Sequence, residues 1–243
     1  MGFRTQSYQA RTIEAETMSA TFTPRRLEKM YAAMYAALGP SNWWPAESDF
    51  EVVVGAVLTQ NTAWGNVEKA IAALRGACCL SPRALRALPE DDLARLIRPA
   101  GFFRLKARRL RNLLDWLETA CGCDLAALRG RDMAGLRAEL LAVNGIGPET
   151  ADCILCYALG YPTFVVDAYT RRIFARHGLV SENIGYEELR GLFMDRLPPD
   201  AAMFNEYHAL IVRVGKEWCR KGGGRCETCP LNTFLPVSQG VFQ

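Results

Sequence analysis

Apolar residues recur in this chain with the spacing of an α-helix, in short segments separated by turn residues. The first segment follows the i, i+3, i+4, i+7 pattern of a helix with one buried face, at Leu27, Met30, Tyr31, Met34 and Leu38. Similar stripes return within residues 93–97, 110–117 and 136–141. The sequence has no sustained two-residue alternation, which is the pattern of a half-buried strand. It therefore predicts an all-α fold of many short helices joined by short loops.

The composition favours a folded chain that does not cross a membrane. A length of 243 residues suits one large domain or two small ones. Half of the residues are hydrophobic and 23% are charged, as in a folded globular chain. No apolar run reaches the length of about 18 residues that a membrane helix needs, and the beginning lacks the pattern of a secretory signal. Residues 1–23 are polar and aperiodic, so we expect a mobile tail, with Met1 or Met18 as the start.

The basic residues are concentrated, although the net charge is only +3. Five of them fall within eight positions with no acid among them: Arg104, Lys106, Arg108, Arg109 and Arg111. Basic side chains bind phosphates, and arginine does so in a bidentate manner. A solvated helix face is the alternative for such a run. We single out Lys106 and Arg109 as candidate phosphate contacts.

Nine cysteines are spread along the chain without the dense spacing of a secreted disulfide scaffold. We therefore expect reduced thiols and a cytoplasmic protein. Three of them stand close together near the C-terminus, at Cys219, Cys226 and Cys229. Thiolates at such intervals are ordinary ligands of iron–sulfur clusters. His177 and His208 show no paired ligand spacing and are interpreted as structural.

Residues 143–152 read VNGIGPETAD and separate two apolar segments. Gly145 and Gly147 can both adopt a positive φ, and Pro148 suits the first turn of a helix. The pattern predicts a helix, a glycine hairpin and a second helix, whose first amide N–H groups form a site for an anion such as phosphate. A plain turn between two antiparallel helices is the alternative.

Asp167 follows the apolar run 164–166 and precedes a helical segment, which by itself predicts an N-cap. Taken together, the glycine hairpin, the segment VDAYTRR at 166–172 and the C-terminal cysteines resemble the endonuclease III-like helix-hairpin-helix (HhH-GPD) DNA glycosylases. Residues 51–71 resemble the first core helix of these enzymes and its loop, and residues 98–110 resemble their Gly-aromatic-x-x-Lys-Ala segment. The similarity covers about residues 25–235.

The resemblance implies two helical domains with a DNA-binding cleft between them. One is a six-helix barrel with the hairpin, at residues 41–161, and the other combines 24–40 with 162–235. The implied partner is double-stranded DNA that contains damaged bases, bound by a monomer at the bacterial nucleoid. The implied backbone contacts combine the hairpin with the two basic residues: Gly145, Ile146, Gly147, Thr150, Lys106 and Arg109.

The resemblance also assigns the chemistry of base excision repair, in which a flipped base loses its N-glycosidic bond. Asp167 matches the family's catalytic acid, whose ionised carboxylate stabilises the cationic sugar and assists the attacking water. Bifunctional members carry a lysine two residues after the second hairpin glycine, where this chain has Glu149. A carboxylate cannot form the imine of the lyase reaction. The resemblance therefore implies a monofunctional glycosylase without AP lyase activity.

The loop LTQNTAWGNV and two earlier tryptophans supply the implied base pocket: Gln60, Asn61, Trp64, Trp43 and Trp44. Gln60 matches the side chain that fills the gap left by the flipped base. Core packing is the alternative for any one tryptophan. This arrangement resembles the methylpurine branch of the family, where aromatic rings sandwich an electron-poor alkylated base. We therefore expect excision of alkylated purines such as 3-methyladenine.

The three C-terminal cysteines match three of the four ligands of the family's [4Fe-4S] cluster. The fourth is expected near position 235, which is Leu235, and no cysteine follows it. A cluster with a non-cysteine or exogenous ligand, a cluster that uses a distant cysteine, and no cluster at all are the three possibilities.

Two alternative functions are consistent with the same motifs. One is an endonuclease III-like glycosylase for oxidised pyrimidines or mismatches, which differs only in the lesion released. The other is a non-catalytic helix-hairpin-helix module that only binds DNA. Asp167 argues against the module, because a pure binder needs no acid beside the sugar.

Overall fold

The computed structural model describes residues 22–236 and divides the chain into two compact units. Unit 1 combines residues before and including Trp43 with those from Phe164 onward, and unit 2 is the contiguous segment Trp44–Thr163. The prediction of an all-α fold is confirmed, because the sheet of the described part is one two-stranded ribbon, β1 (Cys219–Arg220) with β2 (Gly223–Gly224). Among the described helices, none is long and apolar enough to span a bilayer.

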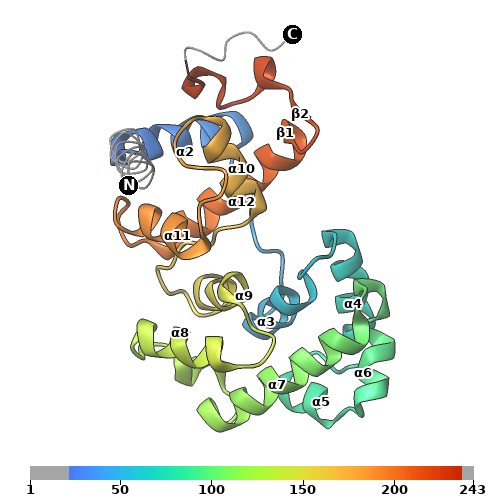
Figure 1. Ribbon diagram of the computed structural model, residues 1–243. Coiled ribbons are helices and arrows are strands. Elements are labelled where there is room, and N and C mark those ends of the chain that lie inside the picture. The colour runs from blue at the N-terminus through green and yellow to red at the C-terminus, as the bar shows by residue number, and fades with distance from the viewer. Residues whose placement is uncertain (1–21, 237–243) are drawn as a thin grey trace, which may run out of the picture. The chain divides into compact units, whose positions relative to one another are not determined.

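Unit 2 is assembled from helices and turns, several of which pack against the apolar helix α3, Asp49–Leu58 (Figure 1). Its elements are α3 (Asp49–Leu58), α4 (Trp64–Gly76), α5 (Pro82–Ala87), α6 (Glu90–Leu96), the 3-10 turn η1 (Arg98–Ala100), α7 (Phe103–Cys121), the 3-10 turn η2 (Leu125–Leu128), α8 (Met133–Ala142), α9 (Pro148–Cys153) and the π-helical turn η3 (Ile154–Ala158). Helix α3 packs against α4, α7 and α9. Its residues from Phe50 to Leu58 are all buried, which explains why its apolar residues show no stripe.

Helix α7 is the long amphipathic helix of unit 2. It buries a stripe of residues along one side: Lys106, Ala107, Leu110, Leu113, Leu114 and Leu117. The helix ends at Gly122, which has a left-handed conformation with φ 58° and whose backbone N–H donates to the Glu118 carbonyl at 3.0 Å. The buried stripe contains the cation Lys106, which apolar periodicity by itself does not predict.

Unit 1 is built from both ends of the described chain. Its elements are α2 (Pro24–Leu38), α10 (Ala168–Arg176), α11 (Tyr186–Met194), α12 (Ala201–Glu217), the two strands, and the 3-10 turns η4 (Cys226–Thr228) and η5 (Asn232–Phe234). Helix α12 packs against α2 and α10. The Tyr207 hydroxyl on α12 donates to the Leu27 carbonyl of α2 at 2.9 Å, so a buried hydrogen bond ties the two ends together.

The core of unit 1 is aromatic. Phe164 stacks on Phe193 with ring centroids 3.9 Å apart, and Phe22 contacts both Phe174 and Phe193. Thr23 caps the first turn of α2. Phe22 and Thr23 therefore belong to the folded unit, which corrects the expected tail at these two positions, whereas residues 1–21 lie outside the described part.

Candidate functional site

Asp167 is the N-cap of α10 in unit 1, as its position before a helical segment predicts. Its Oδ1 accepts hydrogen bonds from the Thr170 amide at 2.8 Å and the Thr170 hydroxyl at 2.9 Å. Its Oδ2 lies 3.7 Å from Nε2 of His208, on α12. Burial by itself would raise the pKa of Asp167, but His208 and the Thr170 bonds outweigh burial and hold it below its ordinary value. The site therefore keeps a buried carboxylate ionised at neutral pH.

His208 is a site residue that the sequence analysis interpreted as structural. The side chain is buried on α12, and its Nε2 lies 3.7 Å from Oδ2 of Asp167. The two residues are 41 positions apart, and no local spacing in the sequence links them. His177, in contrast, is buried with its Nδ1 2.7 Å from the Ile173 carbonyl of α10, which agrees with a structural role.

The glycine hairpin joins α8 to α9 in unit 2. Gly145 has φ +95°, and a Cβ there would lie 2.3 Å from Cγ of Arg109, so only glycine fits. Gly147 has φ −94°, which corrects the expectation that it also uses a positive φ. Pro148 begins α9 as predicted. The N-termini of helices bind anions through their first-turn amides, and this is the role that the motif predicts for the hairpin.

Gln60 binds the hairpin through its side chain. Its Nε2 donates to the Gly145 carbonyl at 3.2 Å and to the Thr150 hydroxyl at 2.9 Å, and its Oε1 accepts from Arg109. The Gln60 side chain therefore bonds to the hairpin in the protein without DNA, and its role in filling the gap left by a flipped base stays a prediction. Thr150 and Ile146 have buried side chains. Their side chains are therefore not available as contacts with a phosphate, which leaves the backbone of the hairpin.

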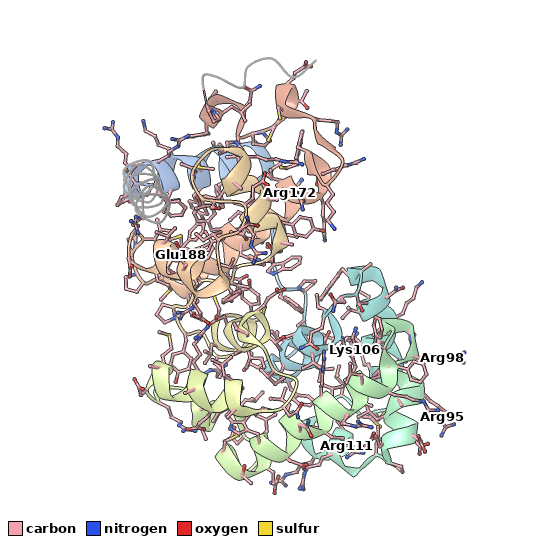
Figure 2. All side chains as sticks on the ribbon, in the orientation of Figure 1. Arg95, Arg98, Lys106, Arg111, Arg172 and Glu188 are labelled. Atoms are coloured by element: carbon pink, nitrogen blue, oxygen red, sulfur yellow. The ribbon has the colours of Figure 1, made fainter. Side chains whose placement is uncertain are left out.

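Lys106 lies inside unit 2 and not on a solvated face (Figure 2). Its ammonium donates to the carbonyls of Leu58 at 2.7 Å and Ala100 at 2.8 Å, and to the Thr62 hydroxyl. Burial, together with the charge of Arg109, lowers the pKa of Lys106 to about 8. The interpretation of Lys106 as a phosphate contact is therefore wrong, because internal acceptors surround its ammonium. On the same helix, Arg104 and Arg108 are exposed.

The tryptophans fall in different units. Trp44 and Trp64 belong to unit 2, where their rings meet edge to face with centroids 4.7 Å apart, and Tyr157 lies 5.7 Å from Trp44. Because Trp44 packs on α3, a Cβ at Gly55 would lie 2.9 Å from its ring. We call Trp44, Trp64 and Tyr157 the aromatic cluster. The sequence analysis did not name Tyr157, which falls within the apolar run after the hairpin.

Trp43 is held on α12 in unit 1. Its carbonyl accepts a hydrogen bond from Asn205 Nδ2 at 3.0 Å, and the Lys216 ammonium lies 6.0 Å from its ring centroid. The preceding loop is fixed by Glu206, whose carboxylate accepts from the amide and hydroxyl of Ser41 at 2.8 and 2.7 Å. The position of Trp43 is therefore set by three side chains of one helix.

Two exposed apolar side chains at the start of α7 were missed by the sequence analysis. Phe102 is 69% exposed and has a left-handed conformation with φ 44°, directly after Gly101 at φ 68°. Leu105 is also exposed. The signal available in the sequence was the run Gly101-Phe102-Phe103, in which one helical face cannot bury both phenylalanines. Asn61, in the α3–α4 loop, is exposed and also left-handed, with φ 52°.

The three C-terminal cysteines line one pocket of unit 1, together with Arg176 and Leu235. Arg176 Nη1 donates to Cys219 Sγ at 3.3 Å, and the Leu231 amide lies 3.5 Å from Cys229 Sγ. Within the described part, no His, Cys, Asp or Glu side chains group closely enough to hold a single metal ion. The remaining cysteines of the chain all belong to unit 2.

Comparison with known proteins places the chain in a family. A family model described as HhH-GPD superfamily base excision DNA repair protein matches residues 54–199. A candidate DNA repair glycosylase of Methanocaldococcus jannaschii is 47% identical, over 85% of this chain and 94% of its own length. Endonuclease III of Thermotoga maritima is 31% identical, over 75% of this chain and 80% of its own length. Among solved structures, an H. pylori 3-methyladenine DNA glycosylase bound to 1,N6-ethenoadenine is similar, with TM-score 0.69 and 28% identity over 81% of this chain and 97% of that one. The chain therefore belongs to the HhH-GPD superfamily of base excision DNA repair proteins, the endonuclease III-like glycosylases that its motifs resemble.

Proposed function

We propose that this protein is a monofunctional DNA glycosylase that releases alkylated purines such as 3-methyladenine from double-stranded DNA. The observation that carries the proposal is Asp167, a largely buried carboxylate whose side chain is 13% exposed and which His208 and Thr170 keep ionised. Cleavage of an N-glycosidic bond develops positive charge on the sugar, and a fixed carboxylate stabilises that charge more than it stabilises the neutral substrate. Family membership supports the same reaction.

Asp167 has two tasks in this reaction. Its oxygen nearer His208 faces the developing oxocarbenium charge, and the carboxylate orients the water that attacks C1′ and receives its proton. The Thr170 bonds fix the second oxygen, so the side chain has little rotational freedom to lose when the substrate binds.

Double-stranded DNA is the proposed partner, and two features of unit 2 support it. The amides in the first turn of α9 suit a backbone phosphate. Phe102 is an exposed ring, and the exposed cations Arg98, Arg104 and Arg108 lie within six residues of it in the sequence. An apolar side chain in such surroundings is suited to insertion between base steps while the cations bind the phosphates.

The absence of lyase activity is proposed from Glu149. It occupies the second position of α9, where it is exposed and where its negative charge complements the helix dipole. Because a carboxylate cannot form a Schiff base with the sugar, strand cleavage through an imine has no nucleophile at this position.

The preference for alkylated purines is proposed from the aromatic cluster. A purine alkylated at N3 or N7 carries positive charge, which lowers the barrier to its release and attracts electron-rich rings. The edge-to-face contact of Trp44 and Trp64 leaves no space for a base between these two rings, so a base would stack beside this pair and not inside it. The H. pylori relative, a 3-methyladenine glycosylase by name, supports this substrate class.

An iron–sulfur cluster is proposed as a structural group held by Cys219, Cys226 and Cys229. The thiols line one pocket, and N–H donors at Arg176 and Leu231 approach two of the sulfurs, as suits thiolate ligands. These cysteines would supply three of the four ligands of such a cluster, because Leu235 stands where the fourth cysteine is expected. When bound, the group would cross-link the C-terminal loop of unit 1. Visible absorbance and iron content of anaerobically purified protein test this proposal, and colourless, iron-free protein would contradict it.

The experiment that tests the function is release of free bases from a panel of duplexes. We expect 3-methyladenine to be released faster than thymine glycol, and Asp167→Asn to abolish release while binding of abasic duplex persists. Borohydride should trap no covalent complex with an abasic duplex. Faster release of thymine glycol would favour an endonuclease III-like specificity, the second candidate that the Thermotoga relative supports. Undiminished release by Asp167→Asn would contradict the glycosylase mechanism.

A further inference from the structure

One buried ammonium joins two segments of unit 2 that are separate in the sequence. Lys106 is 1% exposed, and its Nζ donates to Leu58, the last residue of α3, and to Ala100, the last residue of η1. Its third donor goes to the Thr62 hydroxyl, in the loop between α3 and α4. The Thr62 hydroxyl in turn donates to the Ala100 carbonyl. The loop at 59–63 and the turn at 100–102 therefore share one set of hydrogen bonds.

Each of these two segments presents an exposed side chain from a left-handed backbone position. The loop carries Asn61 at φ 52°, and the turn carries Phe102 at φ 44°. Residues other than glycine and asparagine rarely adopt the left-handed region, so Phe102 keeps this conformation only where its surroundings enforce it. The common element of those surroundings is the ammonium of Lys106.

We propose that Lys106 is a positioning residue, which holds the loop and the turn in the conformation that presents Asn61 and Phe102 to DNA. This inference rests on the proposed function, because it takes these two side chains as DNA contacts. A surface that is ordered before binding loses less conformational entropy when the duplex distorts around it, and it keeps the flipped nucleotide aligned for reaction.

The ammonium is suited to this task by its donors and its charge. Its three N–H donors match three oxygen acceptors, and the Leu58 carbonyl belongs to the negative end of the α3 dipole. Methionine at this position would fill a similar volume but would leave the Leu58 and Ala100 carbonyls without this donor. Lys106→Met therefore removes the hydrogen bonds while it largely preserves the packing.

The first test measures amide hydrogen exchange in the free protein, with Arg108→Met as the matched control. Both variants remove one cation from α7, but Arg108 is exposed. In Lys106→Met we expect at least tenfold faster exchange for the amides of Thr62 and Gly101, which bond to the Thr59 and Arg98 carbonyls, with α12 unchanged. Arg108→Met should leave all of these amides as in the wild type.

The second test measures base release under single-turnover conditions with enzyme in excess. Lys106→Met should lower the maximal rate roughly 10- to 100-fold, because misplacement by about 1 Å has that effect on a reaction, while affinity for an undamaged duplex changes little. Arg108→Met, which removes an exposed cation, should instead weaken the affinity for an undamaged duplex. If Lys106→Met fails to fold, Thr62→Val removes one acceptor of the ammonium and the hydroxyl donor to the Ala100 carbonyl, and it should accelerate exchange at the same two segments.

The outcomes separate this inference from the proposed function. Unchanged exchange at Thr62 and Gly101 in both Lys106→Met and Thr62→Val would overturn the positioning role, whatever the protein excises. Accelerated exchange with an unchanged maximal rate would overturn it as well, because the order of these segments would then not matter to the reaction. If the wild type releases no base from any duplex, the proposed function fails, while the exchange result still decides whether Lys106 holds the two segments.

Discussion

At the scale of single residues, the candidate active site depends on a carboxylate that stays ionised although it is buried. Desolvation favours the protonated form of Asp167, so the site must supply compensating interactions. Thr170 supplies two hydrogen bonds from the first turn of α10, and His208 supplies a favourable electrostatic contact from α12. The helix cap and the proposed catalytic acid are therefore the same side chain, and its role as a cap does not compete with the proposed chemistry.

His208→Ala should shift the acid limb of the pH profile for base release toward neutral pH. The pKa of Asp167 is below its ordinary value in the wild type, so the ionised form persists as the pH falls. Removing His208 takes away one interaction that lowers the pKa of Asp167, while burial still raises it. The pKa of Asp167 should therefore rise. Single-turnover rates between pH 4 and pH 8 would show the shift. His177→Ala, which removes the other buried histidine, is the matched control, and an equal shift in both variants would contradict this account.

At the scale of elements, helix periodicity predicted where helices form but not which polar side chains they bury. The stripe through Leu110, Leu113 and Leu117 identified the buried side of α7. Lys106 lies on that same side, but a basic run favours a solvated face in any analysis of spacing alone. Its burial depends on acceptors at Leu58 and Ala100, and the sequence does not show that these carbonyls converge.

The hairpin illustrates the same limit with its two glycines. Both matched a motif, but only Gly145 has a positive φ and a neighbour that excludes a Cβ. That neighbour is the side chain of Arg109, which belongs to another helix and is remote in the sequence. Tertiary contacts therefore decide which glycine of the motif is required by the backbone.

Gly145→Ala should destabilise the protein by roughly 1–3 kcal/mol, whereas Gly147→Ala should change stability much less. The first substitution combines a strained left-handed backbone with a Cβ 2.3 Å from Arg109, and the second meets no atom within 4 Å at an ordinary φ. Urea unfolding of both variants would measure the difference. Equal destabilisation by the two substitutions would contradict the distinction drawn between the two glycines.

At the scale of the whole molecule, attraction to DNA must come from particular cations. A net charge of +3 over 243 residues gives little general attraction to a polyanion. The relevant quantity is the number of cations that replace counterions at phosphates, and it is measured by the dependence of affinity on salt. Internal cations such as Lys106 add to the net charge but not to this number, since their donors are already used by the protein.

Arg108→Met should therefore reduce the slope of log K against log salt by about 0.9, which is the value for one lost phosphate contact on duplex DNA. Lys106→Met should leave this slope unchanged. Both substitutions lower the net charge equally, so a difference between them cannot arise from total charge. Fluorescence anisotropy would measure the affinity for an undamaged duplex at salt concentrations between about 50 and 200 mM, and the slope follows from these values. A reduced slope for Lys106→Met with no reduction for Arg108→Met would reverse the assignment, because it would place Lys106 at the phosphates and leave Arg108 on a solvated face.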